Sequence, residues 1–260
     1  MIILGLAGLA GSGKDTVADW FVKNKGFVKL SFADEMKRFV LKLFPHVTKE
    51  HLWGPSEMRG ALVSTQLADG WGSITARFCD LIDAKEMGSL RSLNTWVESY
   101  HERTCATVRE ILQTLGTEWG RAIDPLLWVK DLYRRQVPEV MDPKWFGWKA
   151  DWSAVDSAEK WGQDFNPVHG IVIPDHRFPN EVKHTQALRQ LATPVDNRWL
   201  YPHVWRVARP GFEKAPVGGI QGHASEGGLV GVKFDLELDL PEGLHKVPFL
   251  LEAVYQRFLT

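Results

Sequence analysis

The chain has 260 residues, enough to bury a large core in one domain, alone or with a smaller insertion. Its 31 basic and 32 acidic residues give a net charge of −1, so no broad field attracts nucleic acid or a membrane surface. No uninterrupted apolar run reaches membrane-spanning length and two cysteines cannot build a disulfide framework, so we expect a soluble, cytoplasmic protein.

The chain begins with a strand, a glycine-rich loop and a helix. Residues 1–6 are apolar and lack the basic start of a signal peptide, which predicts a buried strand. Apolar residues recur at helical spacing from Val17 onward, so a helix begins near Lys14. Residues 8–16 between them read Gly-Leu-Ala-Gly-Ser-Gly-Lys-Asp-Thr. This order of elements is typical of a loop that binds phosphate.

The residues of this loop indicate a ligand with several phosphate groups, and Mg²⁺. Glycines let backbone N–H groups turn toward an anion, and the helix N-terminus adds partial positive charge. Lys14 would supply formal charge to the β- and γ-phosphates, and the Thr16 hydroxyl could reach magnesium. Asp15 stands where Ser or Thr is usual. The alternative is a glycine-rich turn that only packs closely, with Lys14 in solvent. The loop residues expected around the phosphates are Gly11, Ser12 and Gly13.

Two more elements precede a region without a clear period. Residues 27–32 predict a strand, and residues 34–44 predict a helix that ends before Pro45. Residues 46–104 lack strand alternation, so we expect an inserted region that is mainly helical or irregular. Such an insertion is a candidate substrate-binding region.

An amphipathic helix is predicted from Val108 to Ala122, because apolar residues recur at i, i+3, i+4, i+7 and i+11. A second face of this helix carries Arg109, Gln113, Gly116 and Thr117. Gly116 costs about 1 kcal/mol relative to alanine inside a helix, so its presence needs a reason. One reason is close approach of a ligand or another backbone; the other reading is a solvated polar face. Residues 125–136 predict a further helix that contains Trp128.

The second half of the chain places a carboxylate at the end of a strand. Residues 168–175 predict an apolar strand ending in Asp175, and a helix follows over residues 179–191. Ligands of open α/β sheets bind beyond the strand C-termini, where Asp175 and Arg177 would lie. A local salt bridge or a helix start is the alternative. Before this strand, residues 138–167 hold tryptophans that could pack a small subdomain or an interface: Trp145, Trp148, Trp152 and Trp161.

The C-terminal part supplies two more strands and a helix. Residues 200–207 predict a strand, and residues 209–228 form a polar loop that is long for a compact domain. Loops of this kind often cover active sites. Residues 234–238 alternate as a half-buried edge strand, and residues 247–258 place apolar side chains on one helical stripe.

With these residues assembled, the sequence resembles the deoxynucleoside monophosphate kinases of bacteriophages. The likeness lies in four blocks, spread over most of the chain in the family's order: residues 11–16, 109–118, 175–181, and 209–210 with 223–226. The family's loop also has an aspartate after the lysine, so Asp15 is a family feature. Residues 65–104 and the tryptophan cluster have no counterpart in the family.

The resemblance implies transfer of the ATP γ-phosphoryl group to a deoxynucleoside 5′-monophosphate, which gives ADP and the diphosphate. It places Asp15 in the active site beside Lys14, and it lets Asp175, Arg177 and Glu181 line the same cleft. The side chains and backbone that would contact the acceptor nucleotide are Arg109, Gln113, Gly116 and Thr117, with Trp128 as a neighbour.

Three arginines have expected roles in charge neutralisation, which phosphoryl transfer needs more than covalent help. Arg109 and Arg177 are candidates for the acceptor phosphate or the transition-state charge, because guanidinium binds phosphate bidentately. Arg209 begins the lid-like loop and could close over ATP, which would exclude water.

We expect an α/β P-loop kinase fold in a single domain, with a parallel sheet, helices on both faces and the inserted region over residues 46–104. A kinase for a nucleoside or a coenzyme precursor is the nearest alternative. A regulatory or translocating ATP-binding protein is another, against which stand the absent basic patch and the absence of an acidic pair, since Asp175 is followed by His176. The sequence does not tell which bases are accepted or whether the protein forms a homodimer. If a phage encodes it, we expect it in the host cytoplasm.

Overall fold

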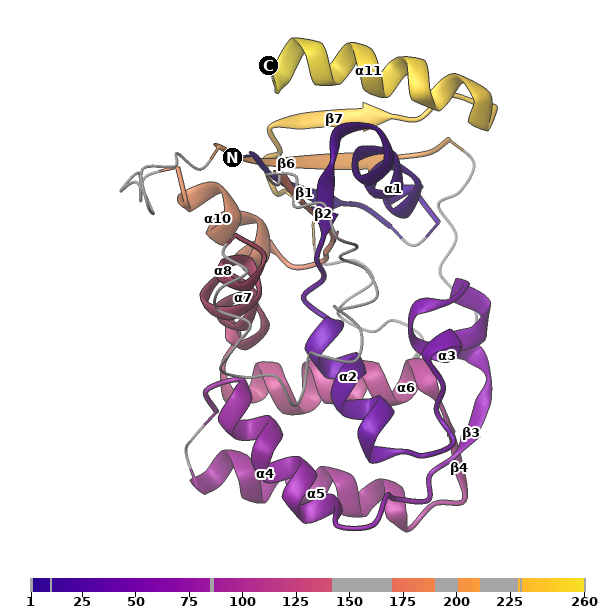
Figure 1. Ribbon diagram of the computed structural model, residues 1–260, viewed down its shortest axis with the longest axis vertical. Helices are drawn as coiled ribbons and strands as arrows, with labels where there is room; N and C mark the ends of the chain where they lie inside the picture. The colour runs from indigo at the N-terminus through magenta and orange to yellow at the C-terminus, as the bar shows by residue number, and fades with distance from the viewer. Residues whose placement is uncertain are drawn as a thin grey trace.

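The computed structural model describes residues 2–9, 11–84, 87–141, 170–189, 201–210, 229 and 231–259. Its centre is a parallel five-stranded sheet in the order β2-β5-β1-β6-β7. Helices flank this sheet, so the expected α/β architecture is confirmed (Figure 1). The strands are β1 (Ile2–Ala7), β2 (Phe27–Lys29), β5 (Gly170–His176), β6 (Tyr201–Ala208) and β7 (Leu236–Asp239).

β1 is the central strand, and its apolar residues are buried on both faces. Side chains alternate along a strand, so neighbouring residues of β1 enter different cores. Leu4 and Leu6 pack in the core beneath α1 (Lys14–Lys25) and α11 (Val247–Phe258). Ile3 belongs to the larger core, which includes α2 (Asp34–Leu43) and α6 (Val108–Gln113). Because both faces are covered, the carboxyl edge of the sheet is the open place for a site.

Several elements differ from their predicted bounds, among them β7, which begins two residues later than predicted. β2 ends at Lys29, because the chain turns away after the Leu30 N–H has bonded the Val172 carbonyl at 3.0 Å. α10 (Pro179–Ala187) starts where the sequence predicts and ends four residues earlier, in a turn at Leu188. β7 lies at the sheet edge, as the alternation of apolar and polar residues predicts.

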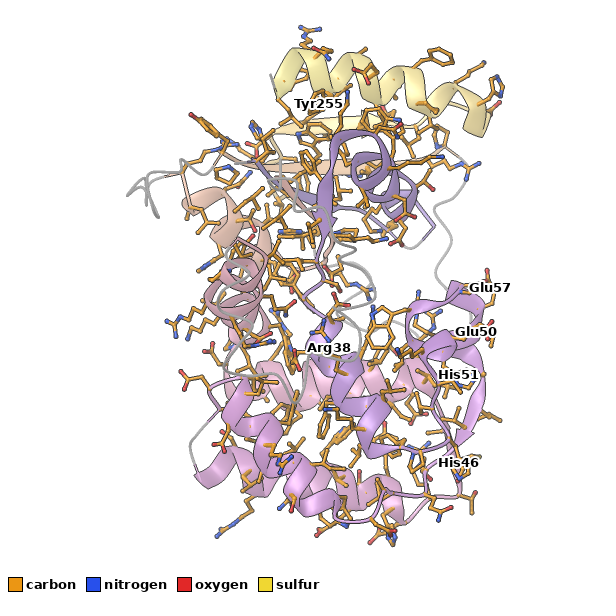
Figure 2. All side chains as sticks on the ribbon, viewed as in Figure 1. Arg38, His46, Glu50, His51, Glu57 and Tyr255 are labelled. Atoms are coloured by element: carbon orange, nitrogen blue, oxygen red, sulfur yellow. The ribbon has the colours of Figure 1, made fainter. Side chains whose placement is uncertain are left out.

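The inserted region is helical with one small sheet. Its helices are α3 (Lys49–Trp53), η1 (Ser56–Gly60), α4 (Trp71–Leu81) and α5 (Met87–His101). β3 (Leu62–Ser64) pairs antiparallel with β4 (Cys105–Thr107), although the sequence predicted no strand here. Three-residue strands are too short to show a period of two. Figure 2 shows Tyr255 on α11, at the opposite end of the molecule from His46, which lies in this helical region.

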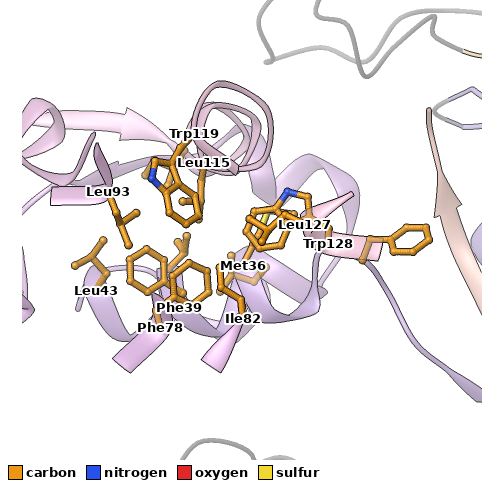
Figure 3. Packing of buried hydrophobic residues seen from close by; sticks show 14 of the residues in the cluster. Met36, Phe39, Leu43, Phe78, Ile82, Leu93, Leu115, Trp119, Leu127 and Trp128 are labelled. Atoms are coloured by element: carbon orange, nitrogen blue, oxygen red, sulfur yellow. The ribbon is translucent and has the colours of Figure 1, made fainter. Parts of the chain in front are cut away.

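Aromatic packing joins α2 to the inserted region. The rings of Phe39 on α2 and Phe78 on α4 stack with centroids 4.1 Å apart. Trp119, Trp128 and Met36 surround this pair in the close view (Figure 3). Large aromatic side chains dominate the burial energy of a core, so this cluster fixes α2 against the helices that follow.

The segment after α6 does not continue as an α-helix. Residues Thr114–Arg121 form the π-helix η2, and α7 (Leu127–Asp131), the π-helix η3 (Leu132–Gln136) and α8 (Val137–Met141) follow. Ala122 was predicted on the buried stripe but is exposed. A π-turn spaces its hydrogen bonds by five residues, which moves the later positions off the expected stripe.

Several predictions fall outside the described residues. These are the tryptophans at 145, 148, 152 and 161, and the loop from residue 211 to 228 with His223, Ser225 and Glu226. A short helix, η6 (Leu244–Lys246), leads into α11. Among the helices that the structure describes, none combines the length and apolarity needed to cross a membrane.

Candidate active site

The glycine-rich loop joins the central strand to the start of α1. Gly11 and Gly13 have φ angles of 78° and 93°, which favour glycine over residues with a side chain. Gly13 is the N-cap of α1, and no side chain caps this helix. The first amides of a helix lack intrahelical partners, so an uncapped N-terminus fits an anion. The loop therefore has the backbone that phosphate binding requires.

Lys14 lies across this loop. Its ammonium donates to the carbonyl oxygens of Gly8 at 2.8 Å and Leu9 at 2.6 Å, and it lies 3.4 Å from Ser12 Oγ. Burial and the nearby positive charge of Arg177 lower the pKa of Lys14 to about 8, although neighbouring carboxylates oppose this shift. An anion at the loop would favour the charged form of this lysine.

Asp15 and Thr16 follow in the first turn of α1, and both are exposed. Asp15 Oδ1 lies 2.9 Å from Lys29 Nζ, which also contacts Asp19 at 2.9 Å. Partial burial alone would raise the pKa of Asp15, but its hydrogen bond with Lys29 and the charge of that lysine lower it below the ordinary value. Asp15 is therefore an ionised carboxylate held by a lysine that the sequence prediction did not include.

Asp175 lies at the end of β5, beside the central strand, and it binds the turn that leads into α2. Its carboxylate accepts hydrogen bonds from Ser31 Oγ at 2.6 Å and from the backbone N–H groups of Phe32 and Ala33 at 3.3 Å. Burial raises the pKa of Asp175, while the Ser31 hydrogen bond and Arg177 oppose the rise. The structure thus shows Asp175 fixing the β2–α2 turn, and a role in catalysis stays a prediction.

Glu181 holds the backbone of the turn that presents Arg177. Its Oε2 atom accepts from the N–H groups of Arg177 at 2.7 Å and Phe178 at 2.9 Å. Burial raises the pKa of Glu181 to about 7, despite these two hydrogen bonds. Arg177 is exposed, whereas Glu181 is buried. The sequence predicted both as cleft residues, but in the structure Glu181 supports the turn from within the protein.

The predicted substrate-binding face of the helix after Thr107 is half-buried at Arg109, Gln113 and Thr117. Gly116 is buried, which excludes the solvated alternative at this position. A Cβ there would lie 3.1 Å from Met36 Sδ, so the close neighbour is a side chain of α2. Trp128 lies in the core, and its Nε1 donates to the Gly116 carbonyl at 2.9 Å. Contact of Trp128 with a nucleotide therefore stays a prediction, and the structure shows the ring supporting η2.

Arg59 is a cation near the loop that sequence reasoning missed. It lies in η1, and its guanidinium donates to the Leu52 carbonyl at 3.3 Å. Burial lowers the pKa of Arg59, and so do the positive charges of Arg109 and Arg177. These side chains are therefore close enough to repel one another. No pattern marks Arg59 in the sequence, because it belongs to a region without a clear period.

Arg209 directly follows β6, the other neighbour of the central strand. The carboxyl ends of parallel strands lie at one edge of a sheet, so Arg209 and the glycine-rich loop share that edge. Lys14, Arg177 and Arg209 thus bring positive charge to this edge, beside the carboxylates of Asp15 and Asp175. Such an arrangement can bind a molecule with several phosphate groups.

Comparison with known proteins adds one partial similarity. No protein-family model matches the chain. Over 59 residues, the chain is 37% identical to a protein of Acanthamoeba polyphaga mimivirus that is provisionally named a deoxynucleotide monophosphate kinase. The match spans 23% of this chain and 30% of the length of the mimivirus protein. The likeness therefore concerns a part of each protein.

Proposed function

We propose that this chain is a P-loop kinase that transfers the γ-phosphoryl group of ATP to a deoxynucleoside 5′-monophosphate. The observation that carries the proposal is the positive charge of Lys14, Arg59 and Arg177 beside a glycine-rich loop at the carboxyl edge of a parallel sheet, with Arg109 next to Arg59. The partial similarity to the mimivirus protein supports a nucleotide kinase.

The glycine-rich loop and the start of α1 fit the triphosphate of ATP. The uncapped amides of the helix N-terminus would donate to phosphate oxygens, and Lys14 would exchange its carbonyl partners for them. Thr16 would offer its hydroxyl to Mg²⁺, and the ion would supply positive charge to the bound phosphates. Arg209 would approach the nucleotide from the end of β6.

The acceptor phosphate fits between the inserted region and the sheet. Arg59 comes from η1, Arg109 from α6 and Arg177 from the turn after β5. Three guanidinium groups from three elements can neutralise the acceptor phosphate and hold it in line with the γ-phosphate. Burial and the repulsion by Arg109 and Arg177 lower the pKa of Arg59, and an anion that enters would relieve this repulsion. The site therefore favours an acceptor that already carries a phosphate over a free nucleoside.

Measuring ADP formation across a panel of acceptors tests the proposed function. The purified protein is supplied with ATP and Mg²⁺, and with nucleosides, ribonucleoside monophosphates and deoxynucleoside monophosphates in turn. We expect turnover that requires a deoxynucleoside monophosphate. Equal turnover of free nucleosides would replace the proposal with a nucleoside kinase, and acceptor-independent ATP hydrolysis as the main activity would support a translocating or regulatory protein.

The Arg59→Gln variant separates the acceptor site from the ATP site. We expect its KM for the monophosphate to rise about tenfold or more, which is roughly 1.4 kcal/mol, while its KM for ATP stays within about twofold. Arg91→Gln is the matched control, since Arg91 is an exposed arginine on α5 of the same inserted region. An unchanged acceptor KM in Arg59→Gln would remove Arg59 from the acceptor site.

A further inference from the structure

Arg121, the last residue of η2, contacts three residues that follow Arg177: Phe178 in the turn after β5, and Asn180 and Glu181 in the first turn of α10. Its Nη2 atom donates to Asn180 Oδ1 at 3.0 Å, and its Nη1 atom lies 3.3 Å from Glu181 Oε1. The guanidinium carbon lies 3.6 Å from the centre of the Phe178 ring. Only 16% of the Arg121 side chain is exposed. A guanidinium uses both its donor edge and its flat face here, which a lysine cannot do.

Glu181 links Arg121 to the backbone of Arg177, because its carboxylate contacts both. One carboxylate oxygen contacts Arg121, and the other accepts from the N–H groups of Arg177 and Phe178. The two oxygens belong to one rigid planar group. Where Arg121 holds the first oxygen, the second oxygen fixes the start of the turn, and with it the Cα of Arg177.

A second hydrogen bond connects the residues after β5 to the segment around η2. Asn180 Nδ2 donates to the carbonyl of Pro125, in the loop that follows η2, at 2.7 Å. η2 in turn is fixed by the hydrogen bond from Trp128 Nε1 to the Gly116 carbonyl at 2.9 Å. The turn after β5 is thus joined on two sides to the segment that carries Gly116 and Thr117.

We propose that Arg121 is a positioning residue: it couples η2 to the turn after β5 and so sets Arg177 for the phosphoryl transfer proposed above. The inference rests on that proposed function for its catalytic consequence and on the contacts of Arg121 for the coupling itself. A displacement of about 1 Å in a positioning group can cost about a hundredfold in rate, so a loosened turn matters even when the fold is intact.

Steady-state kinetics of Arg121→Gln and Arg121→Lys test the catalytic consequence. We expect kcat to fall about tenfold or more in Arg121→Gln, with the KM for ATP within about twofold, and an intermediate kcat in Arg121→Lys, which keeps one charge near Glu181. Arg103→Gln is the matched control. Arg103 also pairs with a glutamate, because its Nη1 and Nη2 atoms donate to Glu110, but this pair lies at the surface of the inserted region. A kcat in Arg121→Gln equal to that of Arg103→Gln would overturn the proposal.

A double-variant comparison asks whether Arg121 acts through Arg177. If it does, Arg121→Gln should reduce kcat little further once Arg177 has been changed to glutamine. Fold-losses that multiply in the Arg121→Gln/Arg177→Gln protein would mean that Arg121 acts by another route, and would overturn the proposal.

Hydrogen exchange tests the coupling without any activity. The amides of Arg177 and Phe178 should exchange about tenfold or more faster in Arg121→Gln than in the parent, and at the parental rate in Arg103→Gln. Unchanged exchange at these amides would overturn the coupling. A parent protein that transfers no phosphoryl group to any acceptor would instead defeat the proposed function, while faster exchange would still support the coupling.

Discussion

Asp15 combines the position of a helix-start residue with the surroundings of an active-site residue. It lies in the first turn of α1, where a carboxylate gains about 0.3–1 kcal/mol from the helix dipole. Its side chain is 76% exposed, so the ion pair with Lys29 adds at most about 1 kcal/mol. The same turn is proposed to hold a triphosphate, which this negative charge would repel. We therefore expect this charge to affect the reaction more than it affects stability.

The Asp15→Asn variant should therefore lower kcat about a hundredfold, or roughly 2.7 kcal/mol of transition-state stabilisation. ATP binding should persist or tighten, because a repulsive charge is removed. Kinetics and ATP-binding titrations measure both effects. Asp19→Asn is the control, since Asp19 shares Lys29 at the same 2.9 Å but lies one helical turn farther from the loop. Turnover of Asp15→Asn within a fewfold of the parent would leave Asp15 as a helix-start residue only.

The residues of the glycine-rich loop could be found from the sequence because their signal is local. Strand, glycines, lysine and helix follow one another within the first 25 residues. Arg59 could not be found this way, because its place beside Arg109 and Arg177 depends on how the inserted region folds. The supporting role of Glu181 could not be predicted either. Its burial and its hydrogen bond to the backbone arise only in the folded turn, and no residue spacing in the sequence indicates them.

At the scale of elements, the sequence predicted regular structure well and departures from it poorly. The long strands are apolar runs and α11 has a clear helical period, and all of them lie close to their predicted positions. Ala122, directly after the π-helix η2, is exposed and off the predicted stripe. Met36 and Trp128 pack against Gly116 and Gly120 of η2, and the spacing of apolar residues does not reveal these contacts. β3 and β4 were missed because each has only three residues.

Gly120 shows how closely η2 is packed. A Cβ at this position would lie 2.3 Å from Cζ2 of the buried Trp128 ring, so Gly120→Ala should lower the free energy of unfolding by about 1–3 kcal/mol. Gly72→Ala is the matched control: Gly72 lies in α4, where an added methyl group has open space around it, and the change should stabilise by up to about 1 kcal/mol. Urea denaturation measures both. Equal effects of the two changes would show that the Trp128 ring moves aside freely.

Two buried groups, His176 and Glu181, change the free energy of unfolding in opposite directions as the pH rises. Burial lowers the pKa of His176 from 6.5 to about 4, so its contribution is complete above pH 6.5 and is lost as the pH falls toward 4. Burial raises the pKa of Glu181 from 4.5 to about 7, so its contribution is greatest below pH 4.5 and is lost as the pH rises toward 7. Between pH 4.5 and 6.5 the two slopes have opposite signs.

The Glu181→Gln variant should reveal how the titration of His176 alone changes the free energy of unfolding with pH. Its free energy of unfolding should rise with pH between 4.5 and 6.5 more steeply than that of the parent, by up to about 1.4 kcal/mol per pH unit. Urea denaturation at several pH values in this window measures the slopes. Glu98→Gln, at an exposed position of α5, should keep the parental slope. A Glu181→Gln slope equal to the parental one would mean that Glu181 titrates at its ordinary pKa.

The pairing of the central strand also sets an order for folding during synthesis. Ile2 pairs with Gly170 on one side and with Tyr201 on the other, and β5 separates β1 from the early strand β2. At about 5–20 residues per second, the ribosome takes roughly ten to thirty seconds to supply the first partner of β1. The helices from α2 to α8 all precede β5 in the chain, so they emerge from the ribosome within that interval. The inserted region can therefore form most of its core early, and the glycine-rich loop, although synthesised before that region, gains its supporting sheet last.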